Sequence, residues 1–198
     1  MPELNFLKTL NGQEIRGPQL LIPKIFEDER GFFYESWNKK EFEKLTDTKN
    51  IIFVQDNHSK SSFGILRGLH YQLPPFGQGK LVRCSYGEIF DVAVDLRKSS
   101  ITFGKWVGIK LNAENKFQLW IPEGFAHGFL TLSNFAEVQY KTTNYWNPKY
   151  ERSINWNDNN LNIEWPREEF GINIISANSK DSAAPCLNDA NSKGDIFN

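Results

Sequence analysis

The sequence contains little sulfur and little histidine, with two cysteines, one methionine and three histidines among 198 residues. Cys84 and Cys186 lie far apart and outside any CxxC pattern. A disulfide framework and a thiolate zinc site are therefore excluded, and reduced cytosolic thiols are expected. No apolar run approaches the ~20 residues of a membrane span, and the first residues lack the pattern of a secretory signal. These absences predict a cytoplasmic protein without a membrane segment.

The sequence also lacks an excess of charge of one sign. Lys plus Arg number 23 and Asp plus Glu number 24, which gives a formal net charge of −1. Without a broad basic field, neither nucleic acid nor a membrane is predicted as a partner. The 39% of hydrophobic residues suffices for a buried core. Six Trp, six Tyr and sixteen Phe favour strands over helical bundles.

Alternating apolar residues dominate the chain from about residue 51 to 146, and Gly, Pro and Asn interrupt them at short intervals. The stretches 89–96, 106–111 and 117–121 show this period of two. The pattern predicts many short antiparallel strands in a sandwich or barrel, each with one buried face and one wetter face. No Walker-type loop or GxGxxG motif supports a phosphate-cradling fold.

Helices are predicted to be few and short. Asn38 is a candidate N-cap for residues 39–45, with Glu41 three positions later. A second helix is expected to start at Ser179, with Ser179 as its cap and Asp181 in its first turn. After residue 181 little remains to pack. The sequence therefore predicts one domain over residues 1–181 and a poorly ordered tail over 182–198.

His70 lies in the segment Leu66-Arg67-Gly68-Leu69-His70-Tyr71-Gln72. Alternation places His70 on the face of Leu66, opposite Arg67, unless a bulge at Gly68 changes the register. A histidine that faces into a barrel can be a base oriented by a carboxylate, or a hydrogen-bonded core residue. Its position alone favours the core residue, and both interpretations stay open.

His127 ends a Pro-x-Gly-x-x-His motif that begins at Pro122, a pattern of cupin barrels in which this histidine is commonly a metal ligand. The companion His-x-His is missing, because residue 72 is Gln. Two histidines and a carboxylate could still bind a metal, but the missing ligand favours a metal-free barrel. His58 is assigned to a loop and receives no role.

Other polar residues stand on apolar strands. Taken singly, Lys80 could extend from the barrel end to water, and Tyr140 could be a core tyrosine. Arg30, Arg67 and Lys80 could bind a diphosphate, since guanidinium groups fit phosphate oxygens. Surface ion pairs are the alternative for these residues.

Several motifs occur together and in order: Asp28 to Glu35, Val54 to Ser59, Leu66 to Gln72, Gly79 to Arg83, Pro122 to Phe129, Tyr140-Lys141 and Ser179 to Asp181. Over about residues 15 to 187 the chain resembles the dTDP-4-dehydrorhamnose 3,5-epimerase family. The resemblance implies an all-β fold, a cupin-like double-stranded β-helix or jelly roll with a few short helices. It also implies a homodimer with exchanged N-terminal strands and no metal or other cofactor.

The resemblance further implies a reaction that inverts carbons 3 and 5 of a dTDP-4-keto-6-deoxyhexose. By similarity His70 is the base, Asp181 orients it, Lys80 stabilises the enolate and Tyr140 is the proton donor. An ordinary imidazole pKa near 6.5 leaves a histidine largely neutral at pH 7, as a base requires. Trp146 occupies the position that stacks on thymine, where Tyr or Phe is usual. The other substrate-binding positions fall on Arg30, Glu35, Gln55, Asp56, Asn57, Arg67, His127, Glu151 and Lys180, some of which would serve the neighbouring subunit.

Rival functions predict different observations. Related enzymes epimerise one carbon or move the ketone between carbons 3 and 4. The His70, Lys80 and Tyr140 set favours double epimerisation. A silent cupin that binds a sugar nucleotide would show protection by dTDP without proton exchange. A metal-dependent cupin oxygenase would contain a stoichiometric transition metal.

Overall fold

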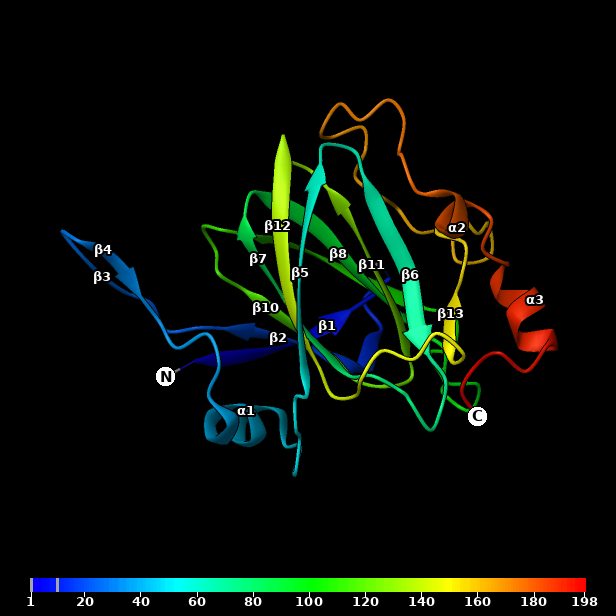
Figure 1. The fold of residues 1–198 in the computed structure, drawn as a ribbon, viewed down its shortest axis with the longest axis horizontal. Helices are drawn as coiled ribbons and strands as arrows, with labels where there is room; N and C mark the ends of the chain where they lie inside the picture. Colours follow the sequence, from blue (N-terminus) through cyan, green and yellow to red (C-terminus); the bar gives the residue numbers. More distant parts are fainter. Residues whose placement is uncertain (1, 10) are drawn as a thin grey trace.

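Two antiparallel sheets dominate the structure, a computed structural model that describes residues 2–9 and 11–198 (Figure 1). The six-stranded sheet has the order β1 (Glu3–Lys8), β2 (Glu14–Ile22), β10 (Gln118–Ile121), β7 (Lys80–Tyr86), β12 (Phe135–Thr142) and β5 (Gln55–Ser62). The five-stranded sheet has the order β13 (Glu151–Ser153), β6 (Leu66–Gln72), β11 (Phe125–Thr131), β8 (Glu88–Asp95) and β9 (Trp106–Asn112). The predicted all-β fold is confirmed.

The space between the two sheets holds one core. Alternation selects its members, because residues two apart on a strand share a face. Val82 and Cys84 on β7 therefore join Ile89 and Ala93 on β8. The same inward faces carry the polar side chains of the candidate site.

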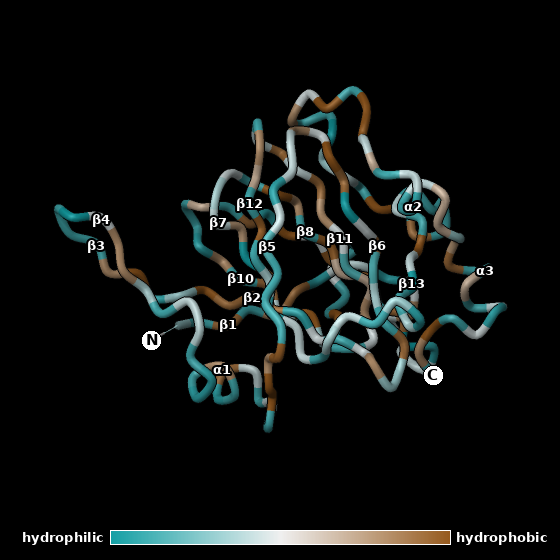
Figure 2. The backbone as a smooth tube through the Cα atoms, in the orientation of Figure 1, coloured by the Kyte–Doolittle hydropathy of each residue, from teal (hydrophilic) through white to brown (hydrophobic). Residues whose placement is uncertain are grey.

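A second core lies outside the five-stranded sheet and differs from the sequence-based prediction of one wetter face per strand. Every residue of β11 is buried. The outward residues Val92 and Val94 of β8 pack against a covering layer from the C-terminal part of the chain. The brown stretches of β8 and β11 in Figure 2 match strands that are enclosed on both sides.

The tail over residues 182–198 belongs to this covering layer, so the prediction that it is poorly ordered is wrong. It forms α3 (Leu187–Ser192), and Leu187, Ala190, Ile196 and Phe197 are buried in the second core. The backbone of Phe197 also exchanges hydrogen bonds with Leu96 and Lys98. The tail is rich in polar residues, and its large apolar side chains Leu187, Ile196 and Phe197 are buried, whereas Ala183 and Pro185 are exposed.

Helix α1 (Lys39–Thr46) covers the lower outer face of the six-stranded sheet, where Phe42 packs against Leu81 and Trp120. Its predicted cap is confirmed, since the Asn38 side chain accepts a hydrogen bond from the Glu41 N–H. Within residues 2–9 and 11–198, none of the helices has the length and apolar composition that a bilayer span requires.

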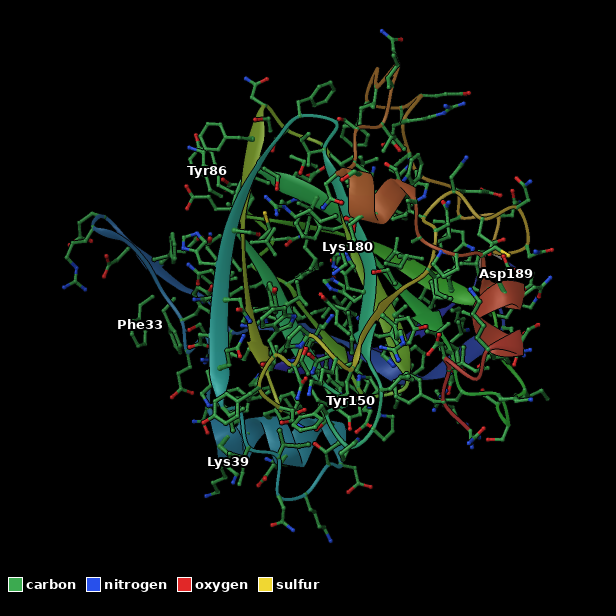
Figure 3. All side chains as sticks on the ribbon, turned by 45° about the vertical axis from the view of Figure 1, so that its right-hand side comes forward. Phe33, Lys39, Tyr86, Tyr150, Lys180 and Asp189 are labelled. Carbon is green, nitrogen blue, oxygen red and sulfur yellow. The ribbon has the colours of Figure 1, made fainter. Side chains whose placement is uncertain are left out.

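A two-stranded hairpin, β3 (Phe26–Asp28) and β4 (Gly31–Phe33), extends away from the body of the molecule (Figure 1). Its aromatic residues Phe26, Phe32 and Phe33 are 52%, 58% and 68% exposed. Figure 3 shows Phe33 on this projecting segment, well separated from the two sheets. We call residues 26–33 the arm.

Candidate active site

An irregularity at Gly68 decides which way the β6 side chains face. The pairing between β6 and β11 shifts between His127↔His70 and Phe129↔Arg67. As a result Leu66, Leu69 and Tyr71 all join the outer core, and Arg67 and His70 share the opposite face. Strict alternation predicted Arg67 and His70 on opposite faces unless Gly68 changed the register. The structure shows that the register does change at Gly68.

His70 is oriented by a buried carboxylate. Its Nε2 lies 2.7 Å from Asp181 Oδ1, and Asp181 is fully buried whereas the His70 side chain is 31% exposed. Because a carboxylate only accepts hydrogen bonds, Nε2 carries a proton, and in the neutral form of the ring Nδ1 then has a free lone pair. Burial raises the pKa of Asp181, but the hydrogen bonds from His70 and from the Gly68 N–H outweigh it and hold the pKa below its ordinary value.

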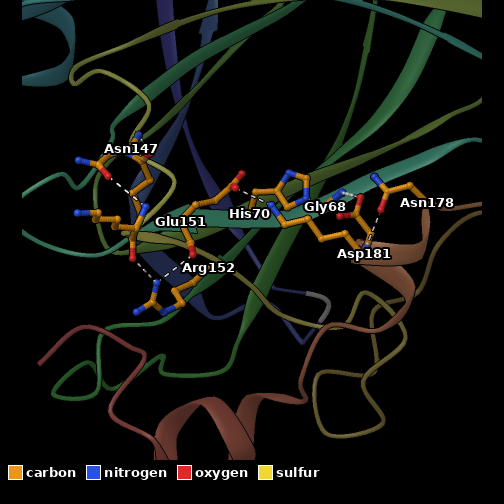
Figure 4. A network of polar contacts seen from close by, with 10 residues as sticks. Gly68, His70, Asn147, Glu151, Arg152, Asn178 and Asp181 are labelled. Carbon is orange, nitrogen blue, oxygen red and sulfur yellow. Dashed lines mark hydrogen bonds and ion pairs between the residues drawn. The ribbon is translucent and has the colours of Figure 1, made fainter.

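Asp181 is presented by the short helix α2 (Ser179–Ser182). The helix begins where predicted, but its cap is Asn178 and not Ser179. The Asn178 side chain accepts a hydrogen bond from the Asp181 N–H at 2.8 Å. Figure 4 shows Asn178, Asp181, Gly68 and His70 in one continuous network.

Lys80 and Tyr140 face the same interior from the opposite sheet. Lys80 is 7% exposed, and its Nζ donates to the His70 carbonyl at 3.1 Å. Burial lowers the pKa of Lys80 to about 8, which leaves the amine largely protonated at pH 7. Burial raises the pKa of Tyr140, so its hydroxyl keeps a proton that it can donate. The candidate site therefore combines an imidazole, a cation and a phenol that carries its proton.

His127 lies deeper in the same interior. It is 6% exposed, and its Nε2 lies 2.7 Å from Asp91 Oδ1. Burial lowers the pKa of His127, and the nearby Lys80 and His70 act in the same direction while Asp91 opposes them. The ring is therefore neutral at pH 7.

The mouth of the site carries a second group of predicted residues. Gln55 Nε2 donates to Asn57, and Gln55 Oε1 accepts from the Trp146 N–H. Trp146 is 56% exposed, so much of its side chain is open to solvent. Arg67 Nε donates to Ser61 Oγ on the neighbouring β5 at 2.8 Å. Gln55 and Asn57 thus lie with Trp146 at the start of β5, and Arg67 lies near the end of the same strand.

Glu151 and Lys180 close the other side of this mouth with an ion pair of 2.5 Å. The Glu151 carboxylate is near enough to influence the pKa values of Lys80 and Tyr140. The pair therefore joins α2, which carries Asp181, to strand β13.

Three predicted site residues do not reach this interior within one chain. Arg30 lies in the arm, where its exposed guanidinium pairs with Asp28. Glu35 lies at the base of the arm beside a groove of about 380 Å³ and accepts hydrogen bonds from Asn38. Asp56 faces the outer side of β5, where Lys141 binds it at 2.9 Å.

The two site histidines are each paired with a different aspartate. Across residues 2–9 and 11–198, no three His, Cys, Asp or Glu side chains are grouped so that they could hold a metal ion. A metal-free site stays a prediction, which elemental analysis of the purified protein would test.

A family model for dTDP-4-dehydrorhamnose 3,5-epimerase matches residues 12–189. The chain belongs to the dTDP-4-dehydrorhamnose 3,5-epimerase family. The predicted family and enzyme class are thereby confirmed.

Relatives of this epimerase family resemble the chain over nearly its whole length. The dTDP-4-dehydrorhamnose 3,5-epimerase of Salmonella typhimurium is 59% identical over 175 residues, which is 87% of this chain and 93% of that protein. The crystal structure of a Legionella pneumophila dTDP-6-deoxy-D-glucose-3,5-epimerase in complex with dTDP-4-keto-L-rhamnose has a TM-score of 0.87 and 47% identity, with 98% of each chain covered. A 3′-monoepimerase from Streptomyces bikiniensis has a TM-score of 0.85 and 32% identity over 92% of this chain and 90% of that chain. These likenesses confirm the predicted cupin-like fold.

Two residues of the candidate site were not predicted from the sequence. Gln72 is 2% exposed, and its amide bonds the backbones of Phe76, Tyr145 and Asn147, so it fixes the loops beside Trp146. Asp91 holds His127. A signal was present for Asp91, because a carboxylate on the inward face of an apolar strand is rarely buried without a partner.

Proposed function

We propose that this epimerase family member inverts carbons 3 and 5 of dTDP-4-dehydro-6-deoxy-D-glucose and forms dTDP-4-dehydro-L-rhamnose. The observation that carries the proposal is the His70–Asp181 pair, which faces Lys80 inside the sandwich. Hydrogens on carbons next to a ketone are acidic, because the carbanion spreads onto the carbonyl oxygen. The site supplies the three groups that such a reaction needs.

His70 Nδ1 would take the proton from carbon 3 or 5, and Asp181 would stabilise the imidazolium that forms. The ammonium of Lys80 would hold the developing enolate oxygen, since positioned charge next to an oxyanion is commonly the largest catalytic contribution. Tyr140 would return a proton to the opposite face of the same carbon, which inverts it. Positioned proton transfer contributes roughly 10²–10⁴-fold.

Nucleotide binding is proposed for the mouth. Trp146 offers a ring for base stacking, and Gln55 and Asn57 lie beside it, whereas Arg67 lies at the other end of β5, where it bonds Ser61. Arg30 and Glu35 would act on the site of a second copy, because they lie on or next to a projecting arm. The exposed aromatic residues of the arm support a homodimer in which they become covered. The homodimer and the cytoplasmic location remain predictions.

The decisive experiment follows deuterium. The protein is incubated in deuterated water with dTDP-4-keto-6-deoxyglucose, and the label is located by NMR. Deuterium at both carbon 3 and carbon 5 is expected, and His70→Ala should abolish both signals. If the sugar lacks deuterium at carbon 3 or carbon 5 after incubation with folded wild-type protein, the proposal is refuted.

A single-carbon epimerase is the second candidate, favoured by the likeness to the Streptomyces bikiniensis 3′-monoepimerase. The identity of 32% to that enzyme is well below the 59% to the Salmonella 3,5-epimerase. Deuterium confined to carbon 3 would select the second candidate.

A further inference from the structure

Asp91 is a fully buried carboxylate on the inward face of β8, between the core residues Ile89 and Ala93. Its Oδ1 bonds His127 Nε2, but its Oδ2 has no hydrogen-bond partner among residues 2–9 and 11–198. Leaving a buried carboxylate oxygen without a donor costs stability. The position therefore calls for a role other than stabilising the fold.

Asp95, four residues along the same strand, shows what a structural carboxylate looks like here. It is also fully buried, but Arg97 binds both of its oxygens, and Ser100 and Thr102 donate to Oδ2. Every acceptor of Asp95 is used to fix the following turn. Asp91 has no such set of partners.

Asp91 Oδ2 faces the same interior as the Lys80 ammonium, which has N–H donors without a partner among the described residues. Lys80 Nζ carries three N–H donors, of which one reaches the His70 carbonyl. In the part of the chain that the structure describes, no carboxylate lies within ion-pair distance of this ammonium.

The groups that face Lys80 come from four neighbouring strands. His70 lies on β6, Asp91 on β8, His127 on β11 and Glu151 on β13. Asp91 and Glu151 favour the charged form of Lys80, although burial outweighs them. Of these two carboxylates, Glu151 is already engaged by Lys180.

We infer that Asp91 is a positioning residue of the site: it anchors the His127 ring through Nε2 and supplies the buried negative charge that supports the Lys80 ammonium without occupying its N–H donors. This inference deepens the proposed function and rests on it for its catalytic meaning. A contact ion pair would consume the donors that the enolate oxygen needs. A carboxylate held nearby by His127 sustains the charge and leaves the donors free.

The His127 bond adds a second consequence. Because Asp91 accepts from Nε2–H, the neutral His127 ring keeps an unprotonated Nδ1. That atom can accept a hydrogen bond from a hydroxyl group of the sugar. Asp91 would thus orient the substrate as well as support the cation.

The test measures the titration of Lys80 directly and so does not depend on turnover. Protein labelled with ¹³C- and ¹⁵N-lysine is titrated by NMR, and the Lys80 signal is assigned by its loss in Lys80→Met. The wild-type midpoint is expected near pH 8. In Asp91→Asn it should fall by about one pH unit, because a charge that favours the ammonium is gone.

Asp95→Asn is the matched control, since it removes an equally buried carboxylate from the same strand and should leave the Lys80 midpoint in place. An unchanged midpoint in Asp91→Asn would overturn the inference. If Asp91→Asn does not fold, ¹⁵N NMR of the His127 ring in the wild-type protein tests the inference instead. A proton on His127 Nδ1 at pH 7 would overturn the inference. Absence of deuterium exchange in the wild type would instead refute the proposed function. The Lys80 titration could still be measured in that case, because it does not depend on turnover.

Discussion

Gly68 is the residue on which the geometry of His70 depends. Its φ of +132° lies in a region that favours glycine. A Cβ built there would lie 2.5 Å from the Gly128 Cα, a contact with rigid backbone. The same residue turns Arg67 and His70 to one face and directs its N–H at Asp181. The register of β6, its packing on β11 and the orientation of His70 therefore all require a glycine at position 68.

Gly68→Ala should lower proton exchange by more than about 100-fold, since small displacements of catalytic groups are costly. Gly171→Ala is the matched control, because Gly171 has a φ of +67° but nothing within 4 Å of its would-be Cβ. The control carries the backbone penalty without the clash. Exchange rates and melting temperatures of both variants make the comparison, and similar exchange rates would contradict the role given to Gly68.

Lys80 illustrates a conflict between stability and chemistry. An unfolded lysine keeps its proton up to the ordinary pKa of 10.5, whereas folded Lys80 releases it near 8. Between these values the unfolded state binds more protons, so stability rises with pH. The cost of burying the charge is therefore full below pH 8 and is removed above about pH 10.5.

Lys80→Met should thus stabilise the protein at pH 7 by about 3 kcal/mol while abolishing exchange. Urea unfolding at pH 7 and at pH 10 measures the effect, and the gain should shrink at the higher pH. A variant that is less stable than the wild type at pH 7 would contradict this account of the buried ammonium.

At the scale of single elements, the sequence predicted the strands correctly but did not predict which of their faces other segments cover. Alternation in 89–96 placed Ile89 and Ala93 opposite Val92 and Val94, as the structure confirms. It could not show that the outward face would also be buried, because the covering residues come from far along the chain. The tail was misjudged for the same reason, since composition does not record where Ile196 and Phe197 pack.

The candidate site shows the same division. Histidine scarcity and motif order singled out His70, His127 and Lys80, and the structure brings them together. Asp91 was missed because its signal, a carboxylate within an apolar strand, also fits Asp95, which has a structural role. The sequence did not show which face of β6 carries Arg67, because a register shift at a glycine depends on the neighbouring strand and not on local sequence.

Helix α2 provides an element-scale prediction. Asn178→Ala removes the side chain that caps Asp181 N–H, at a cost of about 1 kcal/mol. Because Asp181 orients His70, turnover at saturating substrate should fall as well. Asp158→Ala is the control, because Asp158 accepts a hydrogen bond from the Leu187 N–H at the start of α3 and is not a residue of the candidate site, so this change should lower stability but not turnover. Equal turnover losses in the two variants would contradict a positioning role for α2.

At the scale of the whole molecule, the arm separates Arg30 from the interior that holds His70. If the arm serves a second copy, two impaired variants should complement each other. Arg30→Ala and His70→Ala, unfolded and refolded together, would form hybrid dimers with one site free of both changes. The mixture should recover about a quarter of wild-type exchange, since half of the dimers are hybrids with one intact site out of two.

The control for this complementation mixes His70→Ala with Asp181→Asn, two changes that lie in contact within one chain. Each of its hybrid dimers has two damaged sites, so exchange should not recover. Distinct affinity tags on the two chains would establish by sequential purification that hybrids form in both mixtures. Hybrids of the Arg30 and His70 variants that stay inactive would show that the arm does not complete the neighbouring site, because one intact site per hybrid is what an exchanged arm requires.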